Sequence, residues 1–99
     1  MTARAALRLG TRGGAEVLRR DDLGAIEPGK CADLAVWPTD GLELAGAADP
    51  VAGLVLAGAH RVDRLYVGGE LVVSGGALVR ADESEIARAH RAQAVKFAQ

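Results

Sequence analysis

The fold is decided by residues 22–34, which read DLGAIEPGKCADL. Pro28 and Gly29 occupy the two central positions of a type II turn, where Pro presets the first φ and Gly supplies the positive second φ. Apolar segments lie on both sides of this turn, at residues 23–26 and 32–37. The pattern predicts a β-hairpin with the turn at its tip.

A second block of β-structure is predicted toward the C-terminus. Gly68-Gly69 separates two apolar arms, residues 62–67 and 71–73, and glycines supply the positive φ angles of a tight hairpin turn. Another turn, at residues 74–76, leads to the apolar segment 77–79. These features predict a three-stranded antiparallel meander.

The chain is expected to begin with two short helices. Thr2 is suited to cap a helix over residues 3–9, because its hydroxyl can accept a hydrogen bond from a free backbone N–H. Gly10 interrupts this helix. Thr11 is then predicted to cap a second short helix that carries Ala15, Val17 and Leu18 and has Arg19 and Arg20 in its last turn.

Two later helices have clear start signals. Asp49-Pro50 is an N-cap followed by proline at the first helical position, and it predicts a short helix over residues 51–57. Asp82, as an N-cap with Glu85 three residues on, resembles a capping box and predicts the start of a final helix, which residues 86–99 can continue because they contain no Gly or Pro.

Together these elements predict an α+β chain of short antiparallel strands flanked by helices. The apolar residues between positions 5 and 18 are spread around the helices, as in helices that lie between two layers. This chain offers no second layer. It is therefore interpreted as a piece of a larger protein or, alternatively, as a stand-alone non-catalytic scaffold that dimerises to hide its apolar surface.

The composition argues against a nucleic-acid-binding protein, a cysteine nucleophile and a membrane span. The chain has 12 Lys and Arg against 13 Asp and Glu, so it lacks the basic face that nucleic-acid binding needs. Cys31, the single cysteine, fits a reducing compartment, and it has no nearby His partner that would make it a nucleophile. The apolar run at residues 51–59 is too short for a membrane span of about 20 residues. We expect a cytoplasmic protein with no nucleic-acid or membrane partner.

Three blocks of the sequence resemble the C-terminal part of enzymes of the amidohydrolase superfamily. Residues 6–18, ALRLGTRGGAEVL, are similar to the final helical segment of the family, A-T-x-G-G-A-x-x-L-G. Residues 22–34 are similar to its G-x-I-x-x-G-K-x-A-D-L signature. Residues 62–72, VDRLYVGGELV, are similar to its closing V-x-x-V-x-V-x-G-x-x-V hairpin. The blocks follow the family's order and cover nearly the whole chain.

Within the superfamily, Asp49-Pro50-Val51 and the long final helix look most like the branch that deaminates heterocyclic substrates. That branch includes 8-oxoguanine deaminase, guanine deaminase and hydroxydechloroatrazine ethylaminohydrolase. The resemblance implies three parts. Residues 1–22 would be the terminal helices of a metal-dependent hydrolase barrel, residues 23–81 the C-terminal half of a small composite β-sandwich, and residues 82–99 a C-terminal helix.

The resemblance also implies an activity for the parent enzyme. That activity is hydrolysis of a non-peptide C–N bond in a heterocyclic amine such as 8-oxoguanine, guanine or an aminotriazine, with release of ammonia and with bound zinc or iron. The expected partners are the missing barrel, the heterocyclic substrate of the parent and a second copy in a homodimer.

The metal ligands of the family are not expected in this chain. The family uses a His-x-His pair, two later histidines and an Asp on barrel strands. His60 and His90 are the two histidines here, thirty residues apart, with no neighbouring ligand at metal spacing. We therefore expect no catalytic, cofactor-binding or metal-binding residue, and a chain that is inactive alone.

Several other residues invite a functional interpretation but favour a structural one. Gly13-Gly14 lacks the remaining glycines of a phosphate-binding loop, so close helix packing is expected. Lys30 and Asp33 match structural positions of the family, at a turn and a strand start. Asp21-Asp22 and Asp82-Glu83 are expected to be surface charges beside helices.

One position departs from the family pattern. Arg19 stands where the family has Gly after the position of Leu18. Gly there would relieve a left-handed helix end, so Arg19 is expected to cost about 1 kcal/mol of stability.

Overall fold

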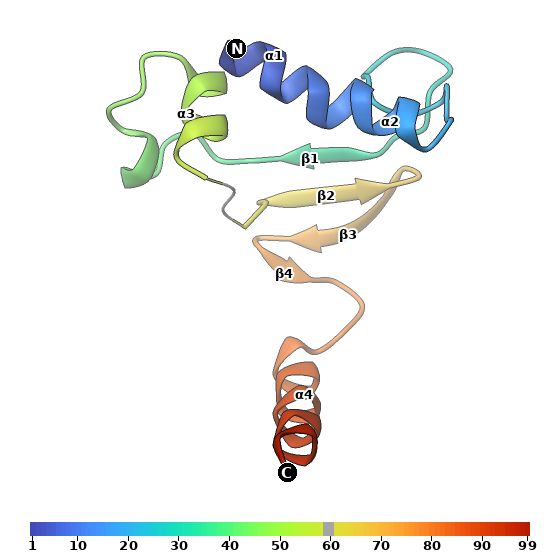
Figure 1. Ribbon diagram of the computed structural model, residues 1–99, viewed down its shortest axis with the longest axis vertical. Coiled ribbons are helices and arrows are strands. Elements are labelled where there is room, and N and C mark those ends of the chain that lie inside the picture. The colour runs from blue at the N-terminus through green and yellow to red at the C-terminus, as the bar shows by residue number, and fades with distance from the viewer. Residues whose placement is uncertain (59–60) are drawn as a thin grey trace.

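The structure is a computed structural model that describes residues 1–58 and 61–99. The elements in chain order are α1 (Ala3–Arg8), the π-helical turn η1 (Leu9–Gly13), α2 (Gly14–Val17), β1 (Leu34–Val36), the 3₁₀ turn η2 (Leu42–Leu44), α3 (Pro50–Leu56), β2 (Arg64–Val67), β3 (Glu70–Ser74), β4 (Ala77–Leu78) and α4 (Glu83–Ala98). The strands lie side by side, with α1 and α2 beyond the β1 edge and α4 leaving from the β4 edge (Figure 1). The predicted α+β class is confirmed.

The first two helices join into one continuous rod, so the predicted break at Gly10 is wrong. Thr2 caps the rod as predicted, because its Oγ1 accepts a hydrogen bond from the N–H of Ala5 at 3.1 Å. Thr11 does not start a new helix. Its hydroxyl donates to the carbonyl of Leu7 at 2.9 Å, and the wider turn η1 carries the chain through this region without a break.

The rod ends at Leu18 in a Schellman motif. Arg19 has a φ of 54°, in the left-handed region, as expected from the glycine of the family pattern. The N–H of Arg19 bonds the carbonyl of Glu16, and the N–H of Arg20 bonds the carbonyl of Ala15, both at 3.0 Å. These two bonds satisfy carbonyls that would otherwise lack partners at the helix end.

The sheet has the strand order β1-β2-β3-β4, all antiparallel, which confirms the predicted meander. The first predicted hairpin is wrong, because residues 23–26 form no strand. The tight turn is present, with Gly29 at φ +87° and the N–H of Lys30 bonded to the carbonyl of Glu27. Beyond that turn, β1 pairs with β2, and Leu34 faces Tyr66. The described residues thus form a sheet of four strands where about five were expected.

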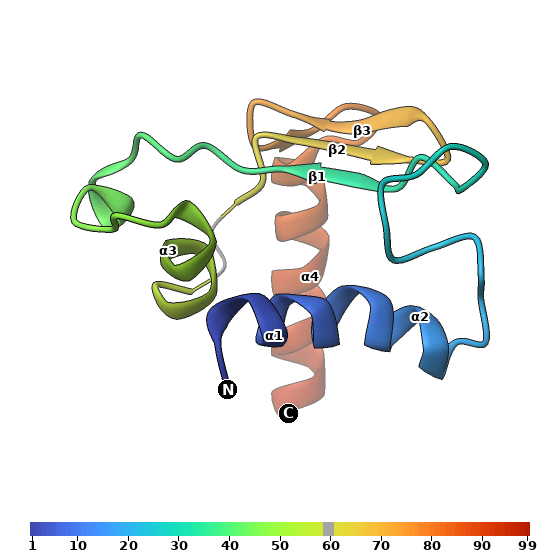
Figure 2. The same ribbon diagram turned by 90° about the horizontal axis from the view of Figure 1, so that it is seen from above.

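Helix α3 begins and ends as predicted. Asp49 caps it by accepting a hydrogen bond from the N–H of Val51 at 3.0 Å, and Gly58, at φ +89°, follows its end. Inside α3, Gly53 leaves space for Leu44, since a β-carbon at Gly53 would lie 2.9 Å from Leu44 Cδ2. Seen from above, α1, α2 and α3 lie on one side of the sheet (Figure 2).

Helix α4 starts at Glu83, directly after Asp82, its predicted cap. The carboxylate of Asp82 accepts hydrogen bonds from the N–H groups of Ser84 at 2.9 Å and Glu85 at 3.3 Å. The helix projects away from the rest of the molecule (Figure 1). No residue of α4 is buried.

The described part of the chain has little core. Its buried hydrophobic side chains are Ala15 and Leu44, at 7% and 8% exposure. The accessible surface is 7699 Å², whereas a compact monomer of 10.2 kDa would expose about 5,300 Å². The radius of gyration is 16.8 Å, against about 13 Å for a compact domain of this length. The chain therefore exposes far more surface than a self-contained domain.

Candidate functional site

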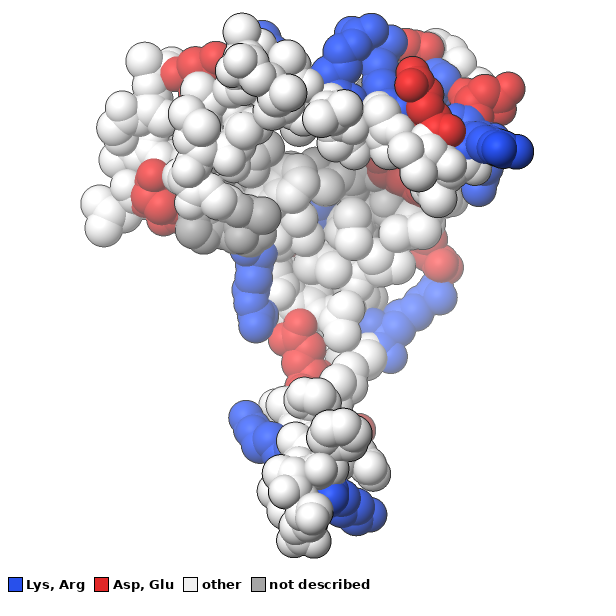
Figure 3. Space-filling view, in the orientation of Figure 1, with Lys and Arg blue, Asp and Glu red and all other residues white. Residues whose placement is uncertain are grey.

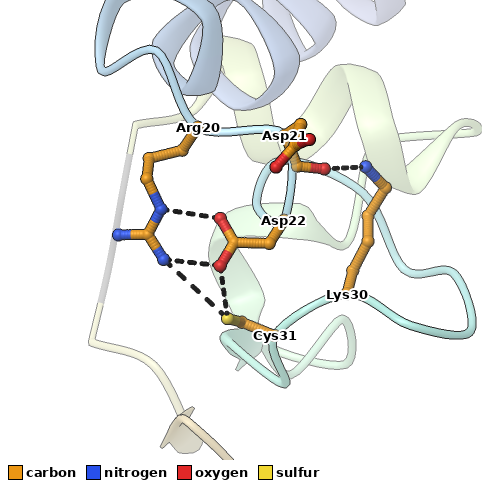
Figure 4. Close-up of polar contacts among 5 residues, drawn as sticks. All are labelled: Arg20, Asp21, Asp22, Lys30 and Cys31. Atoms are coloured by element: carbon orange, nitrogen blue, oxygen red, sulfur yellow. Dashed lines mark hydrogen bonds and ion pairs between the residues drawn. The ribbon is translucent and has the colours of Figure 1, made fainter.

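A cluster of polar contacts joins the end of the helical rod to the turn before β1 (Figure 4). Arg20 donates two hydrogen bonds to the carboxylate of Asp22, from Nε to Oδ1 at 2.6 Å and from Nη2 to Oδ2 at 2.7 Å. Cys31 donates its thiol to the same carboxylate, with Sγ 3.1 Å from Oδ2. A bidentate arginine and a thiol donor together hold Asp22 in one orientation.

Two further bonds close the loop on which this cluster sits. Lys30 donates from Nζ to the carbonyl of Asp21 at 2.6 Å (Figure 4), and the N–H of Cys31 donates to the carbonyl of Asp22 at 2.8 Å. Residues 21–22 and 30–31 are thereby fixed to each other. The loop between them is a closed structural unit, stabilised by bonds that the sequence pattern did not reveal.

Electrostatics in the cluster oppose nucleophilic chemistry. The hydrogen bonds from Arg20, followed by that from Cys31, hold the pKa of Asp22 well below its usual range. The pKa of Arg20 is raised, mainly by its bond to the same carboxylate. The hydrogen bond to Asp22, and then desolvation, raise the pKa of the Cys31 thiol. A nucleophilic cysteine needs a depressed pKa, so the geometry favours a structural thiol.

A second polar contact links two blocks of the sequence. Asp33 accepts a hydrogen bond from the backbone N–H of Gly68, with Oδ1 2.8 Å from the nitrogen. The N–H of Gly69 bonds the carbonyl of Ala32 at 2.9 Å. Asp33 therefore caps the β2–β3 turn from a position 35 residues earlier, which is a structural role at the start of β1.

The described residues do not fit a metal site. Among residues 1–58 and 61–99, no three His, Cys, Asp or Glu side chains come together in a way that could hold an ion. His90 lies on the exposed surface of α4. His60 falls outside the described residues, so the expectation that it is not a metal ligand is not tested by the structure. The part of the chain that the structure describes therefore offers no ligand set for a catalytic metal.

The remaining sequence candidates take structural places. Gly13 and Gly14 lie inside the helical rod, at the junction of η1 and α2. Asp82 caps α4, and Glu83 accepts a hydrogen bond from the N–H of Leu78 at 3.4 Å. Glu83 also pairs with Arg61, at 3.5 Å. Glu83 therefore links the base of α4 to β4 and to Arg61, which precedes β2.

The sequence did not single out Arg20 as the partner of Asp22 and Cys31. A local signal exists, since an arginine two residues before an aspartate can pair with it. The pairing with Cys31 depends on the fold of the intervening turn, and no short-range pattern encodes it.

Among the described helices, none is long and apolar enough to cross a membrane.

Comparison with known proteins gives concordant matches. The Amidohydrolase family matches residues 1–72. The 8-oxoguanine deaminase of Pseudomonas aeruginosa is 43% identical over 94 residues, which cover 95% of this chain and 21% of that protein. The hydroxydechloroatrazine ethylaminohydrolase of Pseudomonas sp. (strain ADP) is 38% identical, over 84% of this chain and 18% of that protein.

The fold matches solved structures as well. A crystal structure of atrazine chlorohydrolase from Arthrobacter aurescens TC1, complexed with zinc, superposes with a TM-score of 0.86 at 40% identity. The match covers 92% of this chain and 20% of that one. The chain spans about a fifth of the length of these relatives.

Proposed function

The chain belongs to the amidohydrolase family, as its sequence predicted, and on that premise we propose that it is the C-terminal segment of a metal-dependent aminohydrolase. In this proposal residues 1–22 are the terminal helices of the catalytic barrel. Residues 23–81 form the C-terminal half of a composite β-sandwich, and residues 82–99 form the final helix. The segment has no activity of its own.

One observation carries the proposal: nearly the whole chain matches a fifth of a deaminase. The match to 8-oxoguanine deaminase takes up 95% of this chain but 21% of the relative. The surface supports the same reading, because the chain exposes roughly 2,400 Å² more than a compact monomer of its mass would. Such an excess is in the range of the contact between permanently associated parts.

The sheet adds a second line of support. Leu34, Tyr66 and Leu71 face each other across neighbouring strands on one face. The opposite face also carries apolar residues, namely Ala35, Leu65, Val73 and Leu78. None of these side chains is buried. A sheet that is apolar on both faces needs a covering layer on each, and the proposed sandwich supplies one of them.

The proposed reaction of the whole enzyme is hydrolysis of a C–N bond on a heterocyclic ring, with release of ammonia. The names of the two deaminating relatives support this class of reaction. The zinc in the structure of the chlorohydrolase supports a metal in the whole enzyme. The ligands for such a metal would come from the barrel, since the described residues of this chain offer no site. Within the enzyme, this chain would close the barrel and the sandwich.

A segment replacement tests the proposal. The matching segment of the Pseudomonas aeruginosa 8-oxoguanine deaminase is replaced by this chain, and ammonia release from 8-oxoguanine is measured. We expect an active chimera, and no activity from the 99-residue chain alone or from the deaminase lacking the segment. The proposal is wrong if the purified chain, supplied with zinc or iron, turns over 8-oxoguanine or an aminotriazine by itself. It also fails if the chimera folds without activity.

A matched pair of variants controls the chimera. Gly24→Ala introduces a clash with Ala15, whereas Gly29→Ala, at a similar φ, meets no atom within 4 Å. If the segment supports the enzyme through its fold, Gly24→Ala lowers the stability of the active chimera more than Gly29→Ala does. Both variants keep the KM for 8-oxoguanine, because neither residue would touch the substrate.

A further inference from the structure

The loop that joins β1 to η2 contains Asp40-Gly41, the one place in the sequence where glycine follows aspartate. Asp40 is exposed and lies outside the helices and strands, and Gly41 directly precedes η2. In such a pair the backbone nitrogen of glycine can attack the side chain of aspartate, because glycine has no β-carbon to obstruct the approach. The reaction requires a free carboxylate and a free nitrogen, and the structure describes both groups.

The carboxylate of Asp40 is free. The chain has seven aspartates, and five of them bond a cation or a backbone N–H through the carboxylate: Asp22, Asp33, Asp49, Asp63 and Asp82. Within residues 1–58 and 61–99, the carboxylates of Asp21 and Asp40 have no such partner. Asp21 is followed by Asp22, whose β-carbon obstructs the next nitrogen. Asp40 therefore combines a free carboxylate with a following glycine.

The charges around the loop fit this picture. On the face drawn in Figure 3, Lys and Arg side chains gather over the end of the helical rod, at the upper right. The left side, where the chain leaves β1 toward η2 in Figure 1, is mostly uncharged. A carboxylate on this side thus lacks the cationic neighbours that hold Asp22.

The backbone nitrogen of Gly41 is also free. Its N–H donates no hydrogen bond to the residues that the structure describes, whereas its carbonyl accepts one from the N–H of Leu44 at 3.1 Å. Gly41 has a φ of −70° and a ψ of 159°, which is extended backbone. The turn η2 therefore holds this glycine by its carbonyl and leaves the nitrogen available to the neighbouring carboxylate.

We propose that Asp40-Gly41 is a site of spontaneous isoaspartate formation. The nitrogen of Gly41 bonds to Cγ of Asp40, and one carboxyl oxygen leaves as water with the amide proton and the carboxyl proton. Water then opens the cyclic imide. Opening at Cγ restores aspartate, whereas opening at the main-chain carbonyl leaves isoaspartate, in which the backbone runs through the side chain and the α-carboxylate is free. This inference does not depend on the proposed function, since it concerns residues of this chain alone.

The rearrangement affects a packed part of the molecule. It adds one carbon to the backbone directly before η2, the turn that carries Leu44. Leu44 is 8% exposed, and its Cδ2 lies 2.9 Å from where a β-carbon at Gly53 of α3 would be. The freed α-carboxylate is also a site for methylation by an enzyme of the class that repairs isoaspartate, with S-adenosylmethionine as the methyl donor.

Warm incubation of the purified chain near neutral pH, in water enriched in heavy oxygen, tests the proposal. Trypsin then releases residues 31–61 as one peptide, which contains three aspartates. Because opening of the imide adds an oxygen from water, we expect heavy oxygen at Asp40 and a second chromatographic peak of the same sequence with isoaspartate there. Asp33 and Asp49 are internal controls, because both carboxylates accept hydrogen bonds. Heavy oxygen at either of them as fast as at Asp40 overturns the proposal.

Gly41→Ala and Gly46→Ala form a matched pair of variants. Ala fits at position 41, since the atoms nearest to its β-carbon belong to the flexible end of Glu43, and a β-carbon at position 46 meets nothing within 4 Å. We expect Gly41→Ala to slow the conversion of Asp40 severalfold and Gly46→Ala to leave it unchanged. Equal rates in the two variants overturn the proposal.

A third variant keeps the charge and changes the length of the side chain. Asp40→Glu should abolish the conversion at position 40, because the longer side chain would have to close a larger and less favourable ring. Its loop needs no repacking, since Asp40 is exposed. Isomerised residue 40 in Asp40→Glu at the rate of the parent chain contradicts the proposed chemistry, whatever the stability of the glycine variants.

Discussion

A β-carbon at Gly24 would lie 2.9 Å from the β-carbon of Ala15, so the loop after the helical rod fits because residue 24 has no side chain. The same β-carbon would lie 3.0 Å from the carbonyl oxygen of Thr11. Gly24 also has a φ of +88°, which suits glycine. Among the described residues, Ala15 is one of two buried hydrophobic side chains, so this contact joins the rod to the loop of residues 22–31 at a buried position.

Substitution of Gly24 by Ala should therefore destabilise the chain strongly. We expect a loss of about 2–4 kcal/mol in the free energy of unfolding, from left-handed strain and from overpacking against Ala15. Gly29→Ala is the matched control, because Gly29 has a φ of +87° and open space around it. It should lose about 1–2 kcal/mol, from backbone strain alone. Urea denaturation measures both, and equal losses would show that the contact with Ala15 contributes nothing.

Arg19 offers a stabilising substitution. Arg19→Gly should raise the free energy of unfolding by about 0.5–1 kcal/mol, because Gly tolerates the φ of 54° that Arg19 adopts. Arg8→Gly is the control within regular helix, and it should lower the free energy by about 1 kcal/mol. Thermal melting followed by circular dichroism measures both. A loss of stability in Arg19→Gly would contradict this account of the helix end.

The contact between Asp33 and Gly68 predicts a local effect at the β2–β3 turn. Asp33→Ala should cost about 1–2 kcal/mol and speed hydrogen exchange at the N–H of Gly68, which loses its acceptor. Asp33→Asn retains an acceptor oxygen and should lose less. Asp63→Ala removes an exposed ion pair with Arg64, and it should change stability by less than about 0.5 kcal/mol. Unchanged exchange at Gly68 in Asp33→Ala would contradict the capping role.

The Asp22–Cys31 pair predicts a stability that falls at both ends of the pH scale. The pKa of Asp22 is lowered on folding, so its contribution is present above the unfolded value of about 4 and is lost as the pH falls below it. The pKa of Cys31 is raised, so its contribution is lost as the pH rises above the unfolded value of about 8.5. Thermal melts across pH should show that Asp22→Asn removes the acidic part of this dependence.

Alkylation of the thiol gives an independent check. At pH 8.5, Cys31 should react with iodoacetamide more slowly than a free cysteine, because less of it is thiolate. Asp22→Asn removes the carboxylate that raises the pKa, so the reaction should become faster. Arg19→Gly leaves the cluster intact and serves as the control. A slower reaction in Asp22→Asn would show that the hydrogen bond to Asp22 does not govern the thiol.

Features encoded over a few residues could be predicted from the sequence. The caps at Thr2, Asp49 and Asp82 are confirmed, because each side chain bonds a backbone N–H two or three residues away. The meander is confirmed for a similar reason, since glycine pairs fix its turns and neighbouring strands pair across them. Family membership also followed from the sequence, because its three blocks are continuous segments.

Other features needed the tertiary structure. Residues 23–26 look like a strand by composition, but Gly24 packs against the helical rod, and β1 finds its partner in β2, about thirty residues away. The rod runs through Gly10 because the π-helical turn accommodates it, which no propensity scale would indicate. Asp33 meets Gly68, and Arg20 meets Cys31, only after the chain has folded.

The sequence by itself determined the family, the antiparallel meander and the helix starts, because short-range turn and capping chemistry sets them. The sequence also contains no His-x-His pair of the kind that binds metal in the family. The tertiary structure alone decided the partner of β1, the cluster that holds Asp22 and Cys31, and the exposure of helix α4. These depend on contacts between distant segments, and a contact between distant segments forms where the packed shape allows it, whatever the local preference.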